Sequence, residues 1–116
     1  MSFTMNLYYN GKDDSARRYA QEMVDSGIVD QIRQQPGCLR YDYFLPMDDR
    51  HTVLLIDSWE SQEALDADHD SPMMRRIAEL RDKYGLTVRA ERHVQDAVPD
   101  TDAKFLQTSA SQNEQE

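Results

Sequence analysis

Cysteine is almost absent from this chain, which carries only Cys38 among its 116 residues. An internal disulfide is therefore impossible, and a reducing compartment is the expected environment. Long apolar runs are lacking as well, since none approaches the ~20 residues of a membrane-spanning helix. The first residues, Met-Ser-Phe-Thr-Met, have no basic and apolar signal region. We therefore expect a cytoplasmic protein without membrane contact.

Basic residues are also few. The chain has 13 lysines and arginines against 22 aspartates and glutamates, which gives a formal net charge of −9. This balance argues against nucleic acid as a partner, because binding to a phosphate backbone requires a basic face.

The end of the chain, residues 95–116, has few large apolar residues, namely Val98, Phe105 and Leu106, and it holds five acids against one lysine. A segment this polar cannot bury enough apolar surface to fold alone. The sequence therefore predicts one domain over residues 1–94. It also predicts an acidic tail over residues 95–116 that is either flexible or packed on a partner subunit.

Apolar periodicity predicts four strands and two helical segments before the tail. Alternating side chains predict strands at residues 3–9, 38–46, 51–59 and 86–94. Helical spacing predicts one helix over residues 15–35, with a possible kink at Gly27. A second helix is expected to start after an N-cap at Ser61 and to end at Gly85. Asp70-Ser71-Pro72 interrupts it, with Ser71 as the new cap and Pro72 in the first turn.

The predicted order is strand, helix, strand, strand, helix, strand. Two strand-helix-strand units in one small domain are typical of the α+β ferredoxin-like fold, in which two helices cover one face of a four-stranded antiparallel sheet.

The other face of such a sheet must meet water or a partner. The strand at residues 51–59 is apolar on both sides, with Val53 and Leu55 on one side and Leu54 and Ile56 on the other. An exposed apolar patch of this size is unusual on a monomer. Covering the patch with a second copy of the sheet is the simplest solution, so we expect a homodimer joined through the sheet face; edge tyrosines that are half exposed on a monomer are the alternative.

Three segments resemble a known family. They are Pro-Gly-Cys-Leu-Arg-Tyr-Asp at residues 36–42, Trp-Glu-Ser-Gln-Glu-Ala-Leu at residues 59–65, and Asp-His-Asp-Ser-Pro at residues 68–72. This set is similar to the antibiotic biosynthesis monooxygenase domain, and most similar to its quinol monooxygenases, over about residues 3–94. The resemblance implies a dimeric α/β barrel whose two sheets face each other, with a pocket between sheet and helices in each subunit. Several members oxidise phenols or quinols with molecular oxygen and without metal or flavin.

The chain departs from the family pattern at several positions. Asp68 stands where many members have a histidine, and His69 follows one residue later. Met73 stands where a histidine often follows the Ser-Pro pair. Of the three residues that haem-degrading relatives use, only the asparagine is matched, by Asn6, which makes haem degradation a poor fit.

The chemistry implied by the resemblance needs a base near neutral pKa, hydrogen bonds to the substrate ring and a dry pocket. His69 is the first candidate for the base, with Asp68 beside it. Trp59 is a candidate for the pocket wall or for an N–H donor, and Asn6 for a ring-oxygen partner. Each has a purely structural alternative: a solvated helix-end histidine, a packed indole and an asparagine that binds backbone. A metal site at Asp66, His69 and Asp70 is disfavoured because no fourth ligand is evident.

The leading hypothesis is a cofactor-independent monooxygenase that oxidises a small quinol or phenol, with molecular oxygen as the co-substrate and no bound cofactor or metal. The predicted pocket lies between the sheet and the helix pair and is bordered by Asn6, Trp59 and the Asp68–His69 corner. The sequence does not decide whether Asn6 faces this pocket or the dimer interface. An isomerase of a small sugar-like metabolite and a non-enzymatic dimeric ligand-binding module remain the alternatives.

Overall fold

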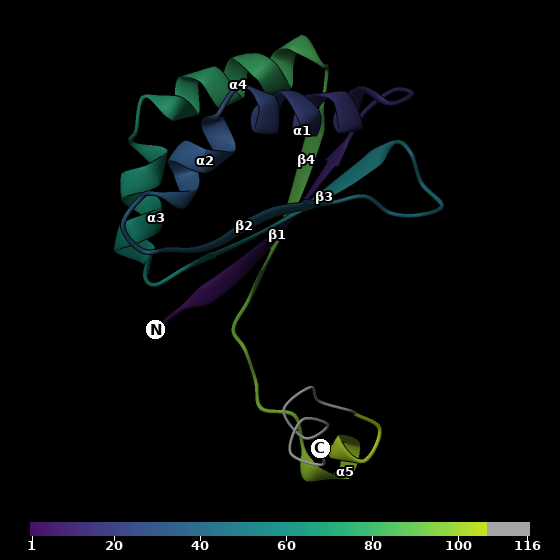
Figure 1. Ribbon diagram of the computed structural model, residues 1–116, viewed down its shortest axis with the longest axis vertical. Coiled ribbons are helices and arrows are strands. Elements are labelled where there is room, and N and C mark those ends of the chain that lie inside the picture. Colours follow the sequence, from purple (N-terminus) through teal and green to yellow (C-terminus); the bar gives the residue numbers. More distant parts are fainter. Residues whose placement is uncertain (107–116) are drawn as a thin grey trace, which may run out of the picture.

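The computed structural model describes residues 1–106 and shows one antiparallel sheet covered by helices on one face (Figure 1). The sheet order is β2-β3-β1-β4. Its elements in chain order are β1 (Phe3–Asn10), α1 (Ser15–Asp25), α2 (Ile28–Arg33), β2 (Cys38–Phe44), β3 (Thr52–Trp59), α3 (Gln62–His69), α4 (Met73–Lys83), β4 (Thr87–His93) and α5 (Asp100–Ala103). The ferredoxin-like α+β prediction is confirmed.

Each of the two predicted helical segments is divided into two helices. The first is broken at Gly27, whose φ of 85° lies in the left-handed region that favours glycine. The second begins as predicted, because the Ser61 hydroxyl accepts a hydrogen bond from the Ala64 N–H at 3.2 Å. The predicted cap at Ser71 is wrong: Pro72 occupies the N-cap of α4, and the Ser71 hydroxyl is buried without a partner.

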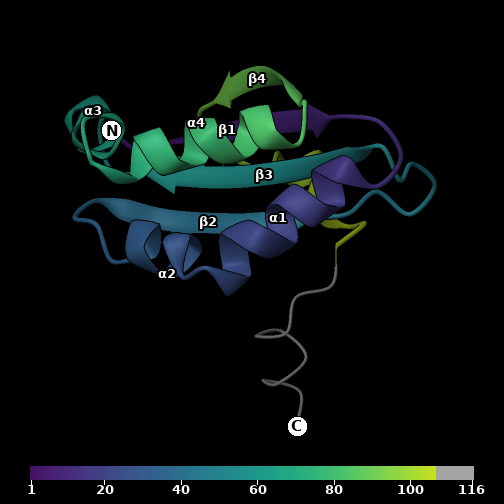
Figure 2. The ribbon, with the colours of Figure 1, turned by 90° about the horizontal axis from the view of Figure 1, so that it is seen from above.

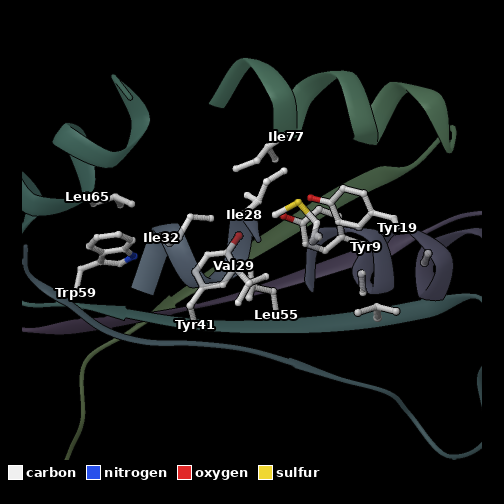
Figure 3. Close-up of a cluster of buried hydrophobic side chains, with 14 of the residues drawn as sticks. Tyr9, Tyr19, Ile28, Val29, Ile32, Tyr41, Leu55, Trp59, Leu65 and Ile77 are labelled. Carbon is white, nitrogen blue, oxygen red and sulfur yellow. The ribbon is translucent and has the colours of Figure 1, made fainter. Parts of the chain in front are cut away.

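The core lies between the sheet and the four helices α1 to α4 (Figures 1 and 2). Alternate residues of β3 are buried, from Val53 through Leu55 and Asp57 to Trp59. Figure 3 shows Trp59, Tyr41 and Leu55 rising from the strands toward the helices, with Leu65 of α3 next to the indole. This face of the sheet positions the candidate site.

A β-bulge in β2 changes one predicted alternation. The register with β3 shifts between Cys38 and Arg40, so that Cys38 lies opposite Trp59 and packs against the core. Leu39 is then 54% exposed, whereas Tyr41, two residues later, is buried. An extra residue in one strand inverts the facing of the residues before it, so the alternation of Arg40 to Phe44 does not extend back to Cys38 and Leu39.

We call the sheet surface away from the helices the open face; it carries Asn6, Tyr8, Phe44, Leu54 and Ile56. The chain after β4 leaves the sheet on this side and leads to α5, and residues 94–106 are exposed throughout (Figure 1). The tail prediction for residues 107–116 lies outside the described residues. Within residues 1–106, no helix is long and apolar enough to span a membrane.

Candidate functional site

The end of β3 places an indole and a carboxylate side by side in the interior. Trp59 is fully buried, and its Nε1 donates a hydrogen bond to Oδ2 of Asp57 at 3.0 Å. The two side chains share one face of the strand because they are two residues apart, and their burial shows that this is the face covered by the helices. Tyr41 is the cross-strand neighbour of Asp57, and Leu65 lies by the indole (Figure 3). The carboxylate is therefore held in a fixed orientation within an apolar layer.

A second buried carboxylate comes from α3. Asp57 is only 6% exposed and Asp68 only 5%. The Oδ1 atom of each is buried without a hydrogen-bond partner. Unpaired polar atoms of this kind are costly to bury and are rare in folded proteins. We call Asp57, Trp59 and Asp68 the carboxylate site.

Burial changes the acidity of both carboxyls. It raises the pKa of Asp57 to about 6, an increase that the Trp59 hydrogen bond opposes and the nearby Asp68 charge favours. Burial likewise raises the pKa of Asp68 above its ordinary value. A carboxyl that titrates close to neutral pH can accept and release a proton under physiological conditions.

His69 ends α3 and is exposed at the protein surface. Its positive charge, when present, lowers the pKa of both Asp57 and Asp68. The charge of the predicted base therefore acts on both carboxylates, but its imidazole is exposed at the surface and not buried in the interior.

Asn6 is not part of this arrangement. It lies opposite Ile56 of β3 and Glu91 of β4, whereas Trp59 lies opposite Phe3. Because facing alternates along a strand, the Asn6 side chain is on the open face and the indole is on the helix side. The prediction that Asn6 and Trp59 border one pocket is wrong, because Asn6 is on the face of β1 that points away from the helices.

Four tyrosines extend the polar content of the interior. The ring centroids of Tyr9 and Tyr19 are 5.1 Å apart, and those of Tyr41 and Tyr43 are 5.9 Å apart. Burial raises the pKa of all four hydroxyls, so that they are neutral at physiological pH. The hydroxyls of Tyr19 and Tyr43 are buried without a partner. The helix side of the sheet is therefore rich in aromatic rings, and two of their hydroxyls have no hydrogen-bond partner among residues 1–106.

The sequence prediction missed Asp57. The signal was present in Val53-Leu54-Leu55-Ile56-Asp57-Ser58-Trp59, because strict alternation places Asp57 on the face of Val53, Leu55 and Trp59. An acidic residue on the core face of a central strand is unusual, since aspartate is almost never fully buried without a partner. Faces were assigned only to Val53, Leu54, Leu55 and Ile56, which left Asp57 without one.

A hollow in the surface lies elsewhere. It has a volume of about 660 Å³, and its borders include Tyr8, Leu54 and Arg89 together with Pro46 of the β2–β3 loop. None of its lining residues belongs to the carboxylate site. Within residues 1–106, no three side chains of the metal-binding types are grouped to hold an ion, so Asp66, His69 and Asp70 do not form such a group.

The fold and the carboxylate site define a class: a small ferredoxin-like α+β protein with buried acid groups under an interrupted helix pair. The chain belongs to the antibiotic biosynthesis monooxygenase family, whose family model matches residues 2–80. No curated protein is significantly similar to it.

Solved structures share the fold at low sequence identity. SnoaB from Streptomyces nogalater, a cofactor-independent oxygenase, is 12% identical with a TM-score of 0.70 over 85% of this chain and 97% of its own. PA3566 from Pseudomonas aeruginosa is 21% identical with a TM-score of 0.69 over 83% of this chain and 95% of its own. Protein SO0527 from Shewanella oneidensis is 13% identical with a TM-score of 0.69 over 81% and 90% of the two chains. At these identities the likeness establishes the fold alone.

Proposed function

We propose that the protein is a cofactor-independent monooxygenase that oxidises a small quinol or phenol with molecular oxygen. The observation that carries the proposal is the buried Asp57 carboxylate, which Trp59 holds through Oδ2 and whose Oδ1 has no donor among residues 1–106, together with the second buried carboxylate of Asp68. A phenolic hydroxyl is a donor of the kind these oxygens lack, and its ring suits an interior lined by tyrosines and an indole. Family membership and the fold shared with SnoaB support the reaction class.

The chemistry requires a base rather than a metal or a flavin. Removing the hydroxyl proton leaves an electron-rich anion, which passes one electron to molecular oxygen. Superoxide then forms a bond to a ring carbon, and the resulting hydroperoxide loses water. For a naphthalene quinol, one oxygen atom ends in the hydroxyquinone product and the other in water, together with the two hydrogens released in the oxidation. The enzyme supplies proton acceptance and the exclusion of bulk water.

Trp59, Asp68 and His69 each have a role in this scheme. Trp59 walls the site and fixes the carboxylate beneath it, Asp68 contributes a second acid group, and His69 exchanges protons with solvent. Substrate reaches the interior where the helix pair is interrupted between α3 and α4, at Ser71 and Pro72. Asn6, on the open face, has no part in the reaction.

The protein acts as a homodimer joined through its open face. Leu54 and Ile56 belong to the central strand β3 on that face, with Phe44 of β2 at one side. Helices α1 to α4 cover the opposite face (Figure 1). A second copy of the sheet is the simplest cover for such a surface.

The sugar isomerase is less well supported than the oxygenase. Phosphorylated metabolites call for positive charges that reach into the pocket, whereas the buried charged side chains here are the two aspartates. The same site would suit a ligand-binding module, and only a measurement of turnover distinguishes that module from the oxygenase.

Oxygen uptake by metal-stripped protein tests the proposal. Reduced naphthoquinones and benzoquinones are supplied in turn, and oxygen consumption is followed with an electrode while the hydroxylated product is identified by mass. Uptake with incorporation of one labelled oxygen atom per product supports the monooxygenase. Binding without uptake supports the ligand-binding module, and the absence of both overturns the oxygenase.

A further inference from the structure

We infer that Asp57 is the group that takes the substrate's hydroxyl proton, and that Asp68 and His69 return this proton to water. The inference rests on the proposed function and deepens it. Three titratable side chains belong to this region: Asp57 on β3 and Asp68 on α3 are both buried, and His69 is exposed at the end of the same helix. The charges on Asp68 and His69 both act on Asp57.

Asp57 is the acceptor because only one of its two oxygens is occupied. Oδ2 receives the Trp59 N–H at 3.0 Å, which fixes the plane of the carboxylate, and Oδ1 is buried with no donor. A fixed carboxylate with one free oxygen is pre-organised for a hydroxyl hydrogen. Asp68 also has an Oδ1 without a partner, but no hydrogen bond from residues 1–106 fixes its side chain in the same way.

The surroundings of Asp57 leave one route for the proton. On the neighbouring strands Asp57 lies opposite Met5 and Tyr41, and its charge also acts on Tyr9 and Cys38. Burial raises the pKa values of Tyr9, Tyr41 and Cys38, which therefore stay protonated at neutral pH. The remaining ionisable neighbours are Asp68 and His69 of α3, each of which influences the charge on Asp57. Two carboxyls in contact with the same low-dielectric interior favour a shared proton over two charges.

In the step itself, the substrate O–H bond breaks and a new O–H bond forms at Oδ1 of Asp57, so that the anion is left with the electron pair. The proton then moves to Asp68 and leaves through His69, which returns Asp57 to its charged form for the next turnover. Molecular oxygen remains the oxidant, as in the proposed reaction.

A binding measurement separates this inference from the proposed function. The probe is 4-nitrophenol, which turns yellow when it ionises near neutral pH, titrated into metal-stripped full-length protein. The bound phenol and the Asp57 carboxylate share one proton, and loss of that proton would leave two adjoining negative charges, so full development of the yellow colour moves to higher pH by about one unit. In Asp57→Asn, an isosteric amide replaces the charge, and the bound ligand ionises at lower pH than in the wild type. Asp66→Asn, an exposed acid on α3, is the matched control and behaves as the wild type.

Each result has one meaning. If the wild type does not bind 4-nitrophenol, the phenol site fails and the inference fails with it. If the ligand binds and its colour change is the same in the wild type and in Asp57→Asn, the phenol site stands and the role of Asp57 is overturned.

In turnover, Asp57→Asn is expected to lower oxygen uptake roughly 10²–10⁴-fold, the usual contribution of a general base.

The exit route is tested with His69→Ala. Loss of an exposed proton carrier slows the return of Asp57 to its charged form, and added imidazole in the buffer restores uptake in proportion to its concentration. Uptake that is unchanged by the substitution, or lowered without rescue by imidazole, overturns the relay through His69.

Discussion

The indole N–H of Trp59 donates to Oδ2 of Asp57, two residues earlier on the same strand, at 3.0 Å within a fully buried layer. A tryptophan at a strand end is often only packing, and here the same ring also orients a charge. The pairing is local in sequence, so the β3 backbone alone brings the two groups together. The rest of the site depends on how α3 lies over the sheet.

The first prediction concerns the stability of the fold against pH. Folding raises the pKa of Asp57 from 3.8 to about 6, so the folded state holds the proton more tightly than the unfolded chain. The resulting stability is fully present below pH 3.8 and is lost as pH rises through about 6. The loss attributable to Asp57 is about 3 kcal/mol, since two pKa units correspond to that free energy. Urea unfolding at a series of pH values measures it.

Asp57→Asn isolates this contribution from the exposed ion pairs of the surface, which contribute little. The variant removes the buried charge while keeping the shape of the side chain, so its free energy of unfolding exceeds that of the wild type above pH 6 and approaches it at low pH. A difference between the two proteins that does not change with pH would mean that Asp57 is ionised alike in the folded and unfolded states.

Much of this arrangement could be predicted from sequence, and the exceptions have physical reasons. Alternation and capping residues such as Ser61 are local properties, so the elements and the fold class follow from them. The bulge at Cys38–Arg40 is set by pairing with β3, which a pattern within one strand does not contain. The facing of Asn6 depends on which side the helices cover, and this is decided by tertiary packing.

The second prediction concerns assembly. Leu54→Glu places a charge in the middle of the open face, where it lies opposite Tyr8 and Phe44, and the homodimer is expected to dissociate because an unpaired charge is costly in an apolar interface. The control is Val24→Glu on α1, where the wild-type side chain is already 49% exposed. Sedimentation at micromolar concentration checks both variants. A wild type that sediments only as a monomer contradicts the dimer itself.

The third prediction concerns the tail. Residues 1–94 are expected to fold without it, because the buried core residues among those described all lie before Gln95. A chain ending at residue 94 should retain the circular dichroism spectrum of the full chain and melt within a few degrees of it, since a loss below about 1 kcal/mol shifts the melting temperature only slightly. Insolubility of the shorter chain, or loss of its dimer, would show that the tail is structural.

The last prediction concerns Trp59→Phe and the pH dependence of oxygen uptake. If Asp57 must be charged to accept the substrate proton, uptake by the wild type rises with pH through about 6. Trp59 opposes the raised pKa by donating to the charged carboxylate, and phenylalanine keeps an aromatic ring but offers no N–H. A hydrogen bond to a charged group is worth about 1.5–3 kcal/mol, which corresponds to about one to two pKa units. The midpoint of the acid limb is therefore expected to move to higher pH by about that amount, while uptake well above the new midpoint recovers.

Tyr84→Phe is the matched control, because it removes a hydroxyl that donates to Glu22 at 2.6 Å and should leave the acid limb in place. An acid limb that stays near pH 6 in Trp59→Phe would separate the indole from the ionisation of Asp57 and would leave Trp59 only its part in packing.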